Sequence, residues 1–83
     1  MALNDNKNYF TTFDLGLAAV LICLGFPLDS LDKTNPQKVK FILQRSNELD
    51  EAIQAYWAKT LRIEPQSLLT NLKFLKNRIY SGE

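Results

Sequence analysis

Residues 38–44 show the clearest pattern in the chain, an alternation of apolar and polar side chains. One face holds Val39, Phe41 and Leu43, and the other holds Lys38, Lys40, Ile42 and Gln44. A period of two predicts a β-strand that is buried on one side. Residues 9–11 and 26–31 are further strand candidates, and turn-forming side chains fill residues 32–36. We expect residues 26–31 and 38–44 to form a hairpin whose lysine face points to solvent or to a partner.

An almost entirely apolar segment predicts a helix over residues 12–24. Thr11 as N-cap places Asp14 at the third helical position, which makes a capping box. Gly25 followed by Pro27 ends the helix. Its apolar run is too short to cross a bilayer, which needs about twenty such residues. We therefore expect a buried helix and no membrane segment.

Apolar side chains cover the whole circumference of this helix, so one packing face cannot hide them all. The remaining side must meet the sheet, the later helices or a second copy of the protein. Self-association often stabilises domains of this size. We therefore expect an interaction module that forms a homo-oligomer, most simply a dimer. The expected contact residues are Leu17, Leu21, Leu24 and Phe74.

Two further helices complete the predicted order of strand, helix, strand, strand, helix, helix. Asn47 is the expected cap of the helix over residues 47–59, and Pro65 the first-turn residue of the helix over residues 65–80. The inward stripes are Leu49, Ala52, Ile53, Tyr56 and Trp57 in the first, and Leu68, Leu72, Leu75 and Ile79 in the second. The sequence predicts one α+β domain over residues 1–83, with a small, largely antiparallel sheet of two or three strands and three helices. Residues 1–8 are expected to be a frayed tail, and Gly82 to follow the last helix.

The order of the last three predicted elements superficially resembles a ribbon-helix-helix DNA-binding protein, in which paired strands of a dimer enter the major groove. Two features weaken this interpretation. Residues 60–64 lack the Gly-x-Ser/Thr type of turn, and Ile42 falls among the base-reading positions.

The chain also resembles a known family at the level of motifs. They are YFTTFDLGLAAVL at residues 9–21 with Gly25-Phe26 after it, the pair Tyr56-Trp57, and a closing Leu-Lys-x-x-Ile-Tyr at residues 75–80. The chain resembles a family of short prokaryotic and phage-associated domains, domain of unknown function 5659. The resemblance implies a compact single domain and brings no activity, substrate or catalytic residue.

Composition excludes most catalytic chemistry. The 83 residues include no histidine, which is the usual general base near neutral pH and the commonest metal ligand. The three glycines are too scattered for a phosphate-binding loop. Asp14, Asp29 and Asp32 lack the spacing of a metal or acid–base site, so we expect them to be solvated. The sequence predicts no enzyme activity, catalytic residue, metal site or cofactor.

The single cysteine, Cys23, lies in an apolar run, where a thiol is unreactive. One cysteine forms no internal disulfide, which favours a reducing, cytoplasmic compartment.

Charge is balanced overall but not along the chain. The net charge is +1, with one base against four acids in residues 1–32 and nine bases against five acids in residues 33–83. The basic candidates for nucleic-acid contact are Lys38, Lys40, Lys73, Lys76 and Arg78. Bases near a helix C-terminus also complement its dipole without any ligand. A nucleic-acid-binding accessory protein or small regulator is therefore the alternative to the self-associating module.

Overall fold

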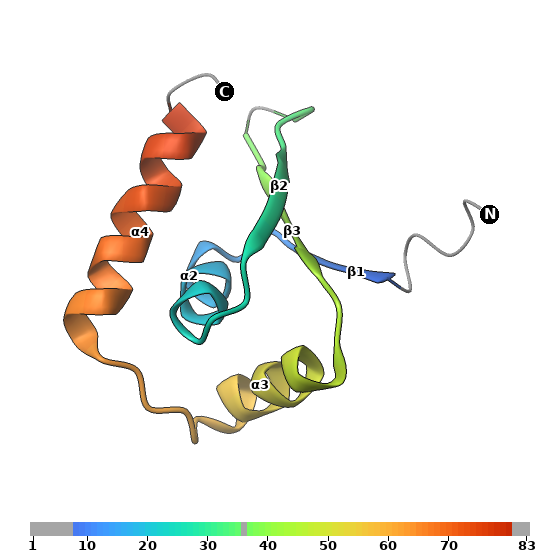
Figure 1. Ribbon diagram of the computed structural model, residues 1–83. Coiled ribbons are helices and arrows are strands. Elements are labelled where there is room, and N and C mark those ends of the chain that lie inside the picture. Colours follow the sequence, from blue (N-terminus) through green and yellow to red (C-terminus); the bar gives the residue numbers. More distant parts are fainter. Residues whose placement is uncertain (1–7, 36, 81–83) are drawn as a thin grey trace.

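The observed chain runs strand, helix, strand, strand, helix, helix, which confirms the predicted order and the α+β class (Figure 1). The computed structural model describes residues 8–35 and 37–80. The elements are β1 (Tyr9–Thr12), α2 (Leu15–Cys23), β2 (Leu28–Asp32), β3 (Lys40–Gln44), α3 (Asn47–Ala58) and α4 (Pro65–Tyr80). The expected tail at residues 1–7 and the expected position of Gly82 lie outside the described residues. Asn8 is not frayed, because its carbonyl accepts a 2.8 Å hydrogen bond from the Arg45 N–H.

The three strands form one antiparallel sheet in the order β1-β3-β2. Phe41 and Leu43 of β3 are buried, and they form a single core cluster with residues of all three helices. This confirms the predicted hairpin and the predicted alternation along β3. It also shows the ribbon-helix-helix interpretation to be wrong, because β3 is the central strand and both of its edges are paired within the chain.

Helix α2 lies at the centre of the fold, with the sheet, α3 and α4 around it (Figure 1). Its residues from Leu17 to Leu21 are buried. Of the three expected covers, the sheet and the later helices therefore hide these residues, and a second copy is not needed for them. Leu17 is 2% and Leu21 0% exposed, so their predicted role in an interface is wrong.

The predicted end of α2 is confirmed and the predicted start is wrong. Gly25 has a left-handed φ of 101°, and the next N–H, that of Phe26, donates to the Leu21 carbonyl at 3.0 Å, as in a Schellman motif. The N-cap is Asp14, whose Oδ1 accepts from the Leu17 N–H at 3.1 Å. Thr11 cannot cap the helix because it is a strand residue paired with Ile42.

Helices α3 and α4 keep their predicted places, with two corrections in α3. The N-cap is Ser46, whose hydroxyl accepts from the Leu49 N–H at 3.0 Å, and not Asn47, which is the first helical residue. Trp57 is 63% exposed and does not belong to the inward stripe. Its ring packs edge-on against Tyr56, with the ring centroids 5.0 Å apart.

The start of α2 makes a first prediction. Replacing Asp14 by alanine should lower the free energy of unfolding by about 1 kcal/mol, because the Leu17 N–H loses its acceptor. Thr11→Ala is the matched control and should lower the free energy of unfolding less than Asp14→Ala. If Thr11 were the N-cap, Thr11→Ala would cause the larger loss. Urea denaturation followed by circular dichroism measures both variants. Equal losses would contradict the assignment of Asp14 as the cap.

Candidate functional site

Among the described residues, none is buried on the face of the sheet that points away from the helices. The strand register places on this open face Tyr9 and Thr11 of β1, Lys40, Ile42 and Gln44 of β3, and Ser30 and Asp32 of β2. The neighbouring positions Phe10, Leu31 and Leu28 pack on the core side. All seven open-face residues are exposed or half-buried. One face of the sheet therefore packs on the core, and the opposite face is accessible to a ligand.

Phe13, between β1 and α2, lies at one end of this face and is 54% exposed. The Lys38 Nζ is 5.3 Å from the centroid of its ring, and the Lys40 Nζ is 5.8 Å from it. Both ammonium groups are within the range of a cation–π interaction. An exposed aromatic ring and two positive charges thus come together from segments 25 residues apart in the chain.

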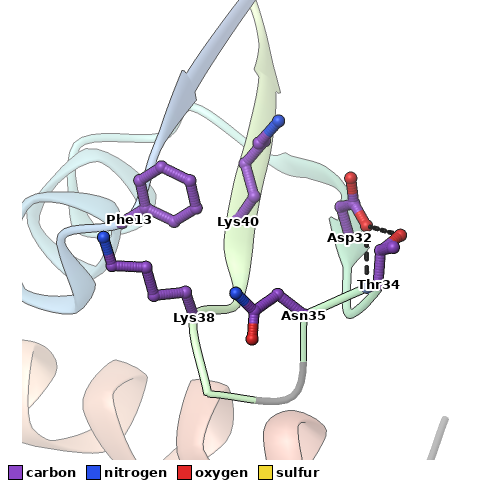
Figure 2. Close-up of a pocket in the computed structure, with 6 residues that line it drawn as sticks. All are labelled: Phe13, Asp32, Thr34, Asn35, Lys38 and Lys40. Atoms are coloured by element: carbon purple, nitrogen blue, oxygen red, sulfur yellow. Dashed lines mark hydrogen bonds between the residues drawn. The ribbon is translucent and has the colours of Figure 1, made fainter.

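These three side chains line a shallow hollow of about 290 Å³ with Asp32, Thr34 and Asn35 (Figure 2). The Asn35 Oδ1 accepts from the Gln37 N–H at 2.9 Å, and Figure 2 shows the amide nitrogen of Asn35 pointing toward the lysines. We call Phe13, Lys38, Lys40 and Asn35 the basic–aromatic site. It offers a ring face, two cations and an amide donor.

Asp32 is the one carboxylate in the hollow, and neighbouring groups hold it in its ionised form. Its Oδ1 accepts from the Thr34 hydroxyl at 2.5 Å and from the Thr34 N–H at 2.9 Å. These hydrogen bonds, and then the charge of Lys40, lower the pKa of Asp32 below its ordinary 3.8. Because Asp32 pairs with Lys40 in the strand register, it offsets part of the positive charge of the site.

The C-terminal end of α4 lies next to the basic–aromatic site. A second hollow of about 330 Å³ is lined by Phe13 and Lys38 together with Ile79 and Tyr80 of α4. The Lys33 Nζ donates to the carbonyl of Arg78 at 2.6 Å, so a cation from the β2–β3 connection satisfies the negative end of the helix. This hydrogen bond therefore joins the connection to the end of the helix.

The structure brings together only part of the predicted basic set. Lys38 and Lys40 share the basic–aromatic site, whereas Arg78 lies over the Phe74 ring on α4, with its guanidinium carbon 5.8 Å from the centroid. Lys73 and Lys76 are exposed on α4. By helical spacing Lys76 lies one turn from Tyr80, on the flank that leads to the second hollow.

The sequence interpretation missed Phe13. The signal was present, because Tyr9, Thr11 and Phe13 follow a period of two that continues through the end of β1. The prediction of Thr11 as the helix cap placed Phe13 inside the helix. A period of two does not tell which face of a helix a side chain lies on, so Phe13 was not assigned to the open face.

The remaining chemical candidates have structural roles. Asp14 caps α2, and Asp29 accepts from the Ser30 hydroxyl at 3.3 Å. Cys23 is half-buried, and the Asn71 Nδ2 donates to its sulfur at 3.1 Å. Within residues 8–35 and 37–80, no group of three His, Cys, Asp or Glu side chains could hold a metal ion.

These features define a class, a small α+β domain with three helices on one face of a three-stranded antiparallel sheet. The family model described as Domain of unknown function (DUF5659) matches residues 7–81, and the chain belongs to this family, as its motifs suggested. No curated protein and no solved structure matches the chain. None of the helices in the described part of the chain is long and apolar enough to span a membrane.

The hydrogen bonds of Asp32 predict a pH effect on stability. Because the pKa of Asp32 is lower in the folded chain than in the unfolded one, its contribution is complete above about pH 4 and is lost as the pH falls further. Asp32→Asn should therefore show a shallower loss of the free energy of unfolding below pH 4 than the parent chain. Urea unfolding at stepped pH values measures this, with Asp29→Asn as the control for removal of one charge from β2. Parallel profiles for the parent chain and Asp32→Asn would contradict the assignment.

Proposed function

We propose that the protein is a non-enzymatic binding module for nucleic acid, and that the basic–aromatic site is its contact surface. The observation that carries this proposal is the exposed Phe13 ring with the ammonium groups of Lys38 and Lys40 at 5.3 and 5.8 Å from its centroid. A nucleotide matches both features, since its base has a flat π-face and its phosphate carries negative charge.

The exposure of the Phe13 ring supports the proposal. Phenylalanine is among the residues most often buried in folded proteins, yet the ring of Phe13 is 54% exposed beside an open hollow. Stacking with an unpaired base contributes about 1–3 kcal/mol, and each phosphate held by a lysine adds a salt-dependent contribution. The single free cysteine fits the reducing, cytoplasmic compartment proposed for this protein.

A binding assay tests the proposal. Fluorescence anisotropy with a labelled oligothymidylate of about 12 nucleotides, at two salt concentrations, should detect salt-sensitive binding. Phe13→Ala should weaken binding roughly 5- to 150-fold. Lys38→Met and Lys40→Met should each weaken it and reduce the salt slope by about 1.

Two exposed residues outside the site provide matched controls. Trp57→Ala removes an aromatic ring from α3, and Arg62→Gln removes a charge from the connection that precedes α4. Both variants should bind like the parent chain. If neither single-stranded nor double-stranded DNA binds at low salt, the proposal is wrong.

A second candidate function is self-association, and its support comes from two residues that the fold leaves uncovered. Phe74 is 43% and Leu24 37% exposed. The hydrogen bond from Asn71 to Cys23 joins α4 to the end of α2 next to both residues, because Leu24 follows Cys23 and Phe74 lies about one helical turn beyond Asn71. We propose that these two exposed apolar side chains form the contact with a second copy of the chain.

Sedimentation velocity across the micromolar range tests this second candidate. The parent chain should sediment partly as a dimer, and Phe74→Ala should shift it to the monomer, because a large part of the shared apolar area is removed. Trp57→Ala should leave the distribution unchanged. A monomer at every concentration would remove self-association from consideration.

A further inference from the structure

The open face of the sheet extends beyond the basic–aromatic site, and its second aromatic residue has no role in the function proposed above. Tyr9 pairs with Gln44 and Thr11 with Ile42, so both side chains share the open face. Phe13 reaches the same face, since it lines a hollow with Asp32 and Lys40. Phe13 is four positions beyond Tyr9 in the sequence, which in extended chain corresponds to about 13 Å.

We infer that the ligand is a single strand that runs along β1, with one base on Phe13 and another on Tyr9. This inference rests on the proposed function and adds to it the class of nucleic acid, the direction of its path and a second stacking residue. Between the two rings the floor of the path is Thr11 and the half-buried Ile42. Both side chains are short enough to let an extended strand pass.

The backbone of β1 provides hydrogen-bond donors along this path. The Asn8 carbonyl bonds to the Arg45 N–H, and backbone groups of an antiparallel strand point alternately toward and away from the neighbouring strand. Phe10 and Thr12 therefore point their N–H groups at β3, whereas Tyr9 and Thr11 point theirs outward. Because β1 is an edge strand among the described residues, these two N–H groups lie beside the path, where phosphate or sugar oxygens can accept from them.

Charge selects β1 over the other edge of the sheet. Tyr9–Thr12 carries no charge, whereas β2 carries Asp29 and Asp32, which repel a phosphate backbone. At the Phe13 end the path meets the two lysines. By the alternation along β3, Arg45 at the Tyr9 end falls on the helix side of the sheet, where it is ion-paired with Asp50 of α3 at 3.2 Å, so it does not line the path. The positive charge along the path is therefore concentrated at its Phe13 end.

A duplex does not fit this arrangement, because its bases are paired and stacked on each other and cannot lie on two separate side chains of a sheet. Recognition by stacking on aromatic residues requires unpaired bases. The path should therefore accept single strands of three or more nucleotides and exclude double-stranded DNA.

Binding as a function of oligonucleotide length provides the test. With oligothymidylates of one, two, three, four and six nucleotides, affinity should rise steeply until both rings are occupied, at about three nucleotides, and only slightly thereafter. Tyr9→Ala should weaken binding of the six-nucleotide strand roughly 5- to 150-fold. Tyr9→Phe should retain it, because the ring remains, and a duplex of equal sequence should not compete.

A mononucleotide separates this inference from the proposed function. Thymidine monophosphate should shift the amide resonances around Phe13 and Lys38 equally in the parent chain and in Tyr9→Ala. If the six-nucleotide strand binds through Phe13 but Tyr9→Ala has no effect, the path along β1 is wrong and the proposed function stands. If no oligonucleotide binds, both are wrong. Tyr9→Leu replaces Tyr9→Ala if the alanine variant does not fold, since leucine keeps apolar volume without a ring.

Discussion

The burial of α2 is the constraint on which the other features of the fold depend. A helix of nine residues that is apolar on all sides can be hidden only if structure surrounds it, and this chain surrounds it with one sheet and two helices. Full burial of a leucine or valine side chain contributes about 1.5–3 kcal/mol, so Leu17, Val20 and Leu21 are major contributors to the small core. The loops and strands are arranged to bring their apolar sides to this helix.

Because the helices are needed around α2, the other face of the sheet is left accessible, and this face holds the candidate site. The described residues form only three strands and three helices, and both α3 and α4 are needed around α2. No helix of the described part of the chain is left for the other side of the sheet. The residues there are consequently half-buried at most. In larger α+β domains such a face is often covered by a further layer. Among the described residues of this chain it stays open, and its largest side chains are Tyr9, Phe13, Lys38 and Lys40.

The sequence was sufficient for the order of elements because the patterns of β3, α2 and α4 are long and regular. Its errors occur where two neighbouring residues could perform the same role. Asp14 and Thr11 are both good caps, as are Ser46 and Asn47, and the choice between them depends on how far β1 and β3 extend. Strand length is set by pairing with distant residues, which a local pattern does not contain. The sequence assigned Trp57 to the inward side of α3 for a related reason. In the structure its neighbour Tyr56 packs against the core at this turn and Trp57 is exposed.

The candidate site was predictable only in part, for the same physical reason. The lysine face of residues 38–44 followed from the alternation, but its partner Phe13 came from another segment and depended on the antiparallel register of β1 and β3. The predicted role of Asp32 as a solvated carboxylate omitted Thr34 and Lys40, whose contacts hold it ionised. Conversely, Leu17 and Leu21 looked available only because the covering helices could not be placed from the sequence.

The contacts of the two lysines with Phe13 bear on how tightly the site can bind. In the free chain each ammonium group lies over the ring, an interaction worth about 0.5–1 kcal/mol at an exposed site. A base that stacks on Phe13 competes for the same ring face, so its gain of about 1–3 kcal/mol is reduced by the cation–π contacts it displaces. The displaced ammonium groups can then form ion pairs with the phosphates, although Asp32 offsets part of their charge. One stacking position therefore gives weak binding, and an affinity useful in a cell requires the ligand to engage several positions along the sheet.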